Sequence, residues 1–377
     1  MEGKSFYHQF LKGKLRIPSI KLDKNIAGTT PPSVFVGSWR YPNVYVGPMV
    51  TPQHGDTTIM DTPELWFSKN TEDILQFRLQ LVRGKQVVSI RDTGNKLVSK
   101  LQEVALASSS VNAEAEFQSV PRGIEFDRIS NPMGPSAVLE KFSIDNIKWN
   151  QRMEKAYYDR DLKASEAVAN LYENDVSLSQ IQKALSVGSF GIGKNRKLVP
   201  TKWSITATDD IVCKQLMERV RDYPSVNEFS VFFASYLGNS FHVLLMPGSW
   251  EFENFESWPS GSAWQSSEEY DPFEGRKSYA DKQVGGYYAS RLGVVEHLNK
   301  IRRQARVVVF REISNEYVIP MGVWVVRECV RAAMRGNAEQ FSTLQSALEY
   351  IGNRTSVKMQ DYRKSSRVLQ QRRVIDF

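Results

Sequence analysis

Two apolar runs separated by a turn signal occupy residues 229–247, and they constrain the fold more than any other feature of the chain. Their large apolar and aromatic side chains favour extended strands. The runs are broken at Gly238-Asn239, a pair of residues that favours a tight reversal. The pattern therefore predicts a β-hairpin. Shorter runs of period two, at residues 34–36 and 44–46, predict two further strands joined by a turn-rich loop.

Helical patterns alternate with these strands along most of the chain. Strong helix formers, apolar residues at helical spacing and capping residues identify the helices. We expect helices at residues 61–83, 96–107, 159–172, 178–185, 211–220, 284–305 and 338–351 and after Gly322, and strands at residues 199–205 and 306–313. Helices and strands together predict an α/β fold of the mixed α+β kind.

The chain is long enough for more than one domain, with 377 residues of which 41% are hydrophobic. Residues 251–283 are rich in Trp, Ser, Gly, Pro and Glu and follow neither period, which predicts a long connection between domains. We expect a leader at 1–27, an N-terminal domain at 28–260, a C-terminal domain at 261–353 and a flexible basic tail at 354–377. No secretion signal or membrane-spanning run is evident, so we expect a cytoplasmic protein without a membrane partner.

Positive charge is concentrated at the C-terminal end. Residues 354–377 hold seven basic and two acidic side chains, a net charge of +5 out of +7 for the whole chain. The preceding 353 residues are nearly neutral. A protein that coats DNA with its globular body more usually carries the charge on that body.

The last seven residues, Gln371-Arg-Arg-Val374-Ile-Asp-Phe377, place an amide, an aliphatic and an aromatic side chain three residues apart. A 3₁₀ turn has about three residues per turn, so these side chains would share one face. Val374 and Phe377 could enter an apolar pocket while the Gln371 amide donates and accepts hydrogen bonds. Many peptides that dock on DNA sliding clamps have this form, usually with a second aromatic residue that is missing here. The alternative is a terminal peptide without a partner.

Two polar segments contain candidate binding residues. Residues 188–195 match part of a phosphate-binding loop, but Asn195 stands where the loop needs Ser or Thr, which argues against an NTPase. Asp209 and Asp210 are candidates for catalysis, and Lys202 nearby is a candidate for phosphate or DNA contact. The simpler interpretation is that one of the two aspartates caps the helix predicted at 211–220. The two cysteines lack the companions of a zinc site, and we predict no metal site.

Charged residues also interrupt apolar segments in the last third of the chain. Glu312 is a further catalytic candidate, and Arg303, Arg311 and Arg327 are candidates for phosphate or DNA contact. Burying a charge is costly unless it is paired. These residues therefore form either structural ion pairs or an anion pocket in which arginines bind phosphate. The sequence leaves both interpretations open.

Several long segments resemble, in order, the archaeal Nre proteins of the NreA type. The resemblance covers the chain from about Pro31 to the C-terminus. It rests on residues 31–48 (PPSVFVGSWRYPNVYVGP), 199–210 (VPTKWSITATDD), 285–292 (GGYYASRL, which adds Arg291 to the DNA-contact candidates), 303–312 (RQARVVVFRE) and 322–328 (GVWVVRE).

The resemblance implies a DNA repair factor of two family-specific domains that works with the clamp PCNA. Its clamp-binding peptide maps onto Gln371, Val374 and Phe377. Some members carry an N-terminal zinc-binding cysteine cluster, which residues 1–24 lack. The family supplies no set of catalytic residues, and the sequence leaves any cofactor unknown. Two alternatives therefore stay open: an enzyme acting on DNA or nucleotides through an Arg/Glu/Asp-lined phosphate pocket, and a scaffold that binds only proteins.

Overall fold

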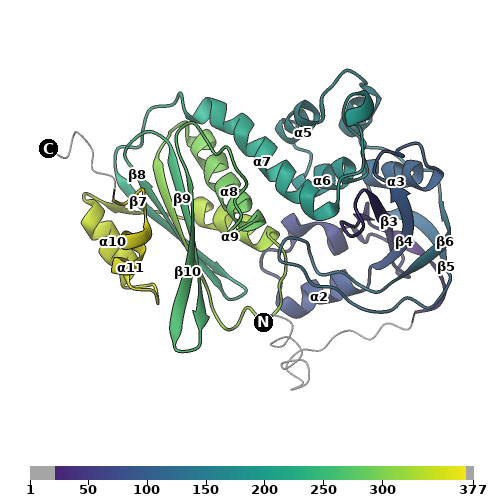
Figure 1. Cartoon of the computed structure of the whole chain (residues 1–377), viewed down its shortest axis with the longest axis horizontal. Helices are drawn as coiled ribbons and strands as arrows, with labels where there is room; N and C mark the ends of the chain where they lie inside the picture. The colour runs from purple at the N-terminus through teal and green to yellow at the C-terminus, as the bar shows by residue number, and fades with distance from the viewer. Residues whose placement is uncertain (1–21, 371–377) are drawn as a thin grey trace. The chain divides into compact units, whose positions relative to one another are not determined.

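A computed structural model describes residues 22–370 of the chain (Figure 1). The chain forms two compact units, each with its own sheet. The first unit runs to Val212 and includes Ile319–Gly322. The second comprises Cys213–Val318 and the chain from Val323 onward. No helix among the described residues is long and apolar enough to cross a bilayer.

The first unit is built on a six-stranded sheet. Its strands, in spatial order, are β1 (Asn25–Thr30), β5 (Val111–Phe117), β6 (Ser136–Ile144), β4 (Val82–Ser89), β3 (Asn43–Val50) and β2 (Val34–Val36). Neighbours are antiparallel except β4 and β6, which are parallel. Strand β5 alternates strictly between buried and exposed residues, the pattern of a strand with one solvated face.

Helices pack on this sheet and on one another. They are α2 (Thr71–Leu79), α3 (Lys96–Leu106), α4 (Gln151–Tyr158), α5 (Ala164–Glu173), α6 (Leu178–Ser186) and the first part of α7 (Thr201–Val220), with short 3₁₀ turns at Thr58–Asp61, Pro63–Leu65 and Gly193–Asn195. Asn95 caps α3 by accepting a hydrogen bond from the Leu97 amide at 3.0 Å. Helix α3 contacts β2, β3 and α6, which joins the helical layer to the sheet.

The second unit is a six-stranded sheet with helices on both faces. Its strands, in spatial order, are β10 (Ala263–Asp271), β9 (Glu251–Ser260), β11 (Arg306–Ile313), β8 (Asn239–Met246), β7 (Phe229–Tyr236) and β12 (Glu339–Phe341). Helices α8 (Gly285–Ile301) and α9 (Trp324–Arg335) cover one face. Helices α10 (Leu344–Gly352) and α11 (Met359–Ser365) cover the other (Figure 1).

Central strand β11 shows why this sheet needs two covering layers. Every residue from Arg306 to Glu312 is buried, so the strand is covered on both faces. Val308 and Phe310 belong to the core under α10 and α11. Because successive side chains point to opposite faces, the alternate residues Val307, Val309 and Arg311 face α8 and α9.

Several predicted elements are confirmed. The hairpin at 229–247 is β7 and β8, with its turn at Leu237 and Gly238. The strand predicted at 306–313 is β11. The helices predicted at 96–107 and 178–185 are α3 and α6 within one residue at each end. The predicted mixed α+β class also holds.

Other expectations are wrong. Residues 199–205 are not a strand, because α7 begins at Thr201 and continues through Asp209 and Asp210 to Val220. These aspartates therefore cap no helix. In the segment 61–83 only Thr71–Leu79 is α-helical. Residues 251–271 are not an irregular connection but the hairpin of β9 and β10, and the boundary that we placed after residue 260 lies in its turn.

Candidate functional site

Residues 354–370, which we expected to be part of a flexible tail, are instead folded against the second sheet, and we call this segment the C-terminal clip. Tyr362 of α11 is its main apolar contact and is 1% exposed. Its ring packs edge-on against Phe255 of β9 and Phe310 of β11, with ring centroids 5.1 and 4.9 Å apart. Val357 and Val368 are buried in the same core.

Glu312 holds the first part of the clip. Its carboxylate accepts hydrogen bonds from the backbone amides of Ser356 and Val357, both at 2.9 Å. It also accepts one from the Tyr362 hydroxyl at 3.3 Å. Three donors hold the buried carboxylate in place. In turn, the two backbone amides gain an acceptor that they would otherwise lack. In this structure the catalytic candidate Glu312 is thus an anchor for the clip.

Two strand residues hold the end of the clip in the same way. Glu253 of β9 accepts hydrogen bonds from the Ser366 hydroxyl and, at 2.7 Å, from the Arg367 amide. Arg306 of β11 donates to the Val368 carbonyl and to Glu251, the latter at 2.8 Å. Together these polar contacts fasten the chain to the sheet four or fewer residues before Gln370.

Burial gives Glu253 an unusual titration. Burial raises the pKa of its carboxyl to about 7, although the hydrogen bonds from Ser366 and Arg367 oppose that rise. The pKa of Glu253 in the folded chain lies above its ordinary value of 4.5. As the pH rises, the carboxyl therefore loses its proton at a lower pH in the unfolded chain than in the folded one. Protonated Glu253 therefore contributes fully to the free energy of unfolding below pH 4.5, and this contribution is lost as the pH rises through about 7.

We therefore expect Glu253→Gln to flatten the pH dependence of stability. In the wild type, this group alone should lower the free energy of unfolding by roughly 3 kcal/mol between pH 4.5 and 7. The uncharged amide has no proton to lose in that range, so the variant should lack this decline. Urea denaturation at a series of pH values measures the difference. Equal slopes in wild type and variant would contradict the assignment.

The outer surface of the clip is basic. All five of its arginines and lysines are exposed, with Asp361 its one acidic residue. They are Arg354, Lys358, Arg363, Lys364 and Arg367. The clip thus buries Val357, Tyr362, Ser366 and Val368 against the sheet and presents cations outward.

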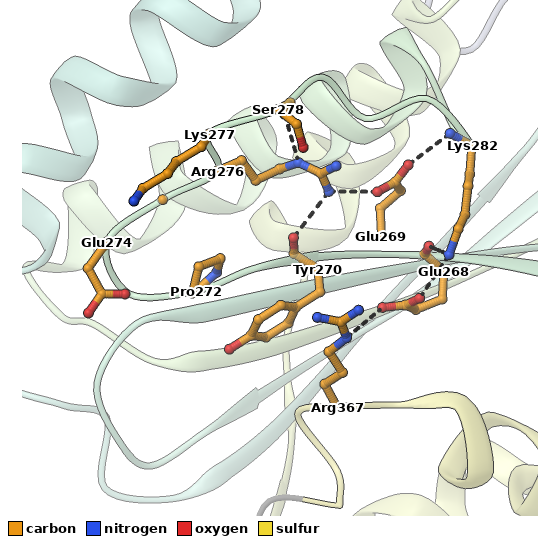
Figure 2. Close-up of a pocket in the computed structure, with 11 residues that line it drawn as sticks. Glu268, Glu269, Tyr270, Pro272, Glu274, Arg276, Lys277, Ser278, Lys282 and Arg367 are labelled. Carbon is orange, nitrogen blue, oxygen red and sulfur yellow. Dashed lines mark hydrogen bonds and ion pairs between the residues drawn. The ribbon is translucent and has the colours of Figure 1, made fainter.

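A pocket with a cavity volume of about 630 Å³ lies beside the clip, with Arg367 on its wall (Figure 2). Its charges are largely paired. Arg276 donates to Glu269 at 2.6 Å, while Lys282 and Arg367 lie 3.3 and 3.8 Å from Glu268. A pocket whose cations are already neutralised offers a phosphate little net attraction. Arg276 and Lys282 thus tie the loop after β10 to that strand, and the contact of Arg367 with Glu268 ties the clip to the same strand.

Arg311 lies on the opposite face of the sheet from Glu312. It donates to Glu256 at 2.5 Å and to the Asn239 side chain at 2.7 and 3.0 Å. Its neighbour in sequence, Glu312, binds the clip. Adjacent strand residues point to opposite faces, so these two side chains do not line one pocket.

The other arginine candidates in the second unit have separate surroundings. Arg291 of α8 is buried and donates to Asp271 at 2.8 Å. Arg327 of α9 is buried with its Nε 3.7 Å from Glu328. Arg303 is exposed and donates to the Arg302 carbonyl. The structural ion-pair interpretation therefore fits Arg291, Arg311 and Arg327.

The first unit holds the remaining candidates on α7. Asp209 is buried and lies 3.5 Å from the Gln182 amide nitrogen, whereas Asp210 and Lys202 are half-buried. No cluster of His, Cys, Asp or Glu suited to a metal occurs within residues 22–370. Gln371, Val374 and Phe377 lie outside the described residues.

The sequence interpretation missed the clip because its anchors are distant in sequence. Glu253 lies in a segment without periodicity, and Arg306 and Glu251 gave no local signal. The available sign was the pair of glutamates, Glu253 and Glu312, inside segments that are otherwise strand-like. Their partners are 44 to 114 residues away.

Comparison with known proteins identifies relatives over nearly the whole chain. The family description "Archaeal Nre, N-terminal" matches residues 8–265, and "Archaeal Nre, C-terminal" matches residues 271–376. "DNA repair protein NreB" of Archaeoglobus fulgidus is 38% identical over 90% of this chain and 88% of its own length. No solved structure matches the chain.

Two further relatives are named "DNA repair protein NreA". The protein of Archaeoglobus fulgidus is 37% identical over 93% of this chain and 89% of its own length. That of Haloferax volcanii is 32% identical over 91% of this chain and 86% of its own. With both family regions matched and these identities across the chain, this protein belongs to the archaeal Nre family.

Proposed function

We propose that this protein acts in DNA repair and is recruited to DNA by the PCNA sliding clamp, which binds Gln371, Val374 and Phe377. The names of three relatives support the repair role. The three-residue spacing of the amide, aliphatic and aromatic side chains supports the clamp as the partner.

The observation that carries the proposal is the position of the clip. It is fastened to the sheet through Glu312, Glu253 and Arg306, and it ends one residue before Gln371. Gln370 is exposed, and its side-chain amide donates to the carbonyls of Arg363 and Lys364 at 2.7 Å. The peptide therefore starts from a fixed point on the folded body, and the residues before it would lose little conformational freedom on docking. For so short a peptide we expect a Kd in roughly the micromolar range.

The exposed cations of the clip favour DNA as a second partner over the protein-only scaffold. A sliding clamp encircles DNA, so a protein docked on it is held near the phosphate backbone. Cations such as Arg363 and Lys364 would add an attraction that weakens as salt rises. The separate surroundings of Arg311 and Glu312 give the enzyme alternative no support.

We expect Phe377→Ala to reduce clamp binding by at least tenfold, because the aromatic ring would fill most of the apolar pocket of the partner. Ile375→Ala is the matched control: it also removes an apolar side chain, but from a position that the spacing places off the shared face. Calorimetric titration of the purified clamp into each full-length variant measures both. Equal losses in the two variants would argue against the proposed register, and no loss in either would refute the docking site.

A further inference from the structure

An exposed group of aromatic side chains lies in the first unit, at the turn between β2 and β3. Trp39 and Tyr41 of this turn are 67% and 45% exposed, and Trp203 near the start of α7 is 43% exposed. Large aromatic rings dominate cores and interfaces because of their apolar area, so three of them at the surface call for an explanation. We call Trp39, Tyr41, Tyr45 and Trp203 the aromatic platform.

The rings form two contacting pairs. Trp39 stacks on Tyr45 of β3, with ring centroids 6.0 Å apart and planes only 9° from parallel. Tyr41 contacts Trp203 with centroids 5.1 Å apart and planes inclined by 55°. Trp39 and Tyr41 are two residues apart, so their Cα atoms lie within about 7 Å of each other, and each ring pair has one member in this turn. The platform thus offers two adjacent aromatic positions.

Cations accompany the rings. The Arg40 guanidinium lies 5.3 Å from the centre of the Trp39 ring, and the Lys85 ammonium lies 5.9 Å from that of Tyr45. Arg40 is exposed and Lys85 half-buried. Lys202, the phosphate-contact candidate of α7, is the residue before Trp203. Glu125, the acidic residue near Lys85, forms an ion pair with Arg83 at 2.9 Å.

The backbone holds the platform in place although its rings are exposed. The Gly37 amide donates to the Tyr45 carbonyl at 2.7 Å, and the Ile90 amide donates to the Pro42 carbonyl at 2.9 Å. The Val36 amide donates to the Thr201 hydroxyl at 3.0 Å, which ties β2 to the first turn of α7. A rigid presentation of exposed rings lowers the entropy cost of binding a ligand.

Arg40 itself adopts a left-handed backbone conformation, with φ of 63°. That conformation is uncommon for a residue other than glycine. Strained conformations of this kind persist where the surrounding structure holds them, and they are concentrated at binding sites. Arg40 adopts this conformation between Trp39 and Tyr41, the two platform residues of the turn.

We propose that the aromatic platform binds unpaired bases of single-stranded DNA, with Arg40, Lys85 and Lys202 contacting the phosphates. Every base has a flat π-face that stacks on an aromatic ring, whereas phosphates need nearby cations. The turn after β2, strands β3 and β4 and the start of α7 together supply both. The choice of DNA over a protein partner rests on the proposed repair role, but the site does not depend on the clamp.

The test compares binding of a fluorescein-labelled single strand of mixed sequence with binding of the same strand in a duplex, followed by anisotropy. We expect Trp39→Ala and Trp203→Ala each to weaken single-strand binding by about tenfold. Duplex binding should be little changed, because its bases are already stacked on one another. Phe233→Ala is the control, since it removes a ring that is 49% exposed in the second unit.

A salt series separates stacking from charge. The tryptophan variants should keep the dependence of affinity on salt, whereas Arg40→Gln should lower its slope by about one phosphate contact. Thermal melting of each variant verifies the fold. Unchanged single-strand affinity in both folded tryptophan variants would overturn the inference and assign the platform to a protein partner. A failure of Phe377→Ala to affect clamp binding would leave this result untouched, so the two proposals fail separately.

Discussion

Tyr362→Ala is expected to lower the free energy of unfolding of the second unit by about 3–5 kcal/mol, the usual cost of truncating a buried aromatic side chain. The ring is 1% exposed and packs between Phe255 and Phe310. The truncation would leave a cavity at the point where the clip meets the sheet. Urea denaturation followed by far-ultraviolet circular dichroism measures the loss.

Tyr362→Phe separates packing from hydrogen bonding. It keeps the ring but removes the hydroxyl that contacts Ser257 at 3.0 Å and Glu312 at 3.3 Å. We expect a cost of about 1 kcal/mol from these lost bonds. If Tyr362→Ala were no more destabilising than Tyr362→Phe, the clip would not be packed as described.

Arg311→Met is expected to cost about 3–5 kcal/mol, because it leaves a charge uncompensated beneath α8. Arg311 is 6% exposed and forms an ion pair with Glu256. Space there is tight: a side chain on Gly286 would bring its Cβ within 2.5 Å of the Glu256 carboxylate. The carboxylate therefore has little room to turn towards another partner.

The double variant Arg311→Met/Glu256→Gln tests this explanation. Removing both charges should recover much of the stability lost in Arg311→Met, since the penalty comes mainly from the unpaired carboxylate. Chemical denaturation of the wild type, the two single variants and the double variant gives the coupling free energy. Simple additivity of the two single losses would contradict a structural ion pair.

The sequence predicted those elements whose residues share one environment. Residues Val307–Phe310 of β11 are continuously apolar because the strand is covered on both faces, and the Gly238-Asn239 signal predicts the β7–β8 hairpin. The helix α7 was wrongly divided because Val199, Trp203 and Ile205 suggest alternation. Tertiary packing overrides such local preference.

Strands β9 and β10 were not predicted, for a different reason. β9 buries polar residues such as Asn254, which receives a hydrogen bond from Ser290 at 2.8 Å and donates one to Gln283 at 2.7 Å. A strand that buries amides and carboxylates has no apolar alternation. Hydrogen-bond partners on α8 and on the clip stabilise β9, and these partners lie far away in sequence.

The candidate site was predictable only in part. The Gln371, Val374 and Phe377 pattern is local and can be identified by spacing alone. The clip before it buries few apolar residues, chiefly Val357, Tyr362 and Val368, among exposed cations. That composition is typical of a solvated tail, so its attachment could not be inferred without the sheet.

The most direct test of the account is clamp binding by a chain that ends at Gln370. This truncation removes the proposed clamp peptide and leaves every described contact of the clip in place. We expect an unchanged melting temperature and loss of binding to purified PCNA in a calorimetric titration, while the full chain binds with a Kd in roughly the micromolar range. Undiminished binding by the truncated chain would contradict it.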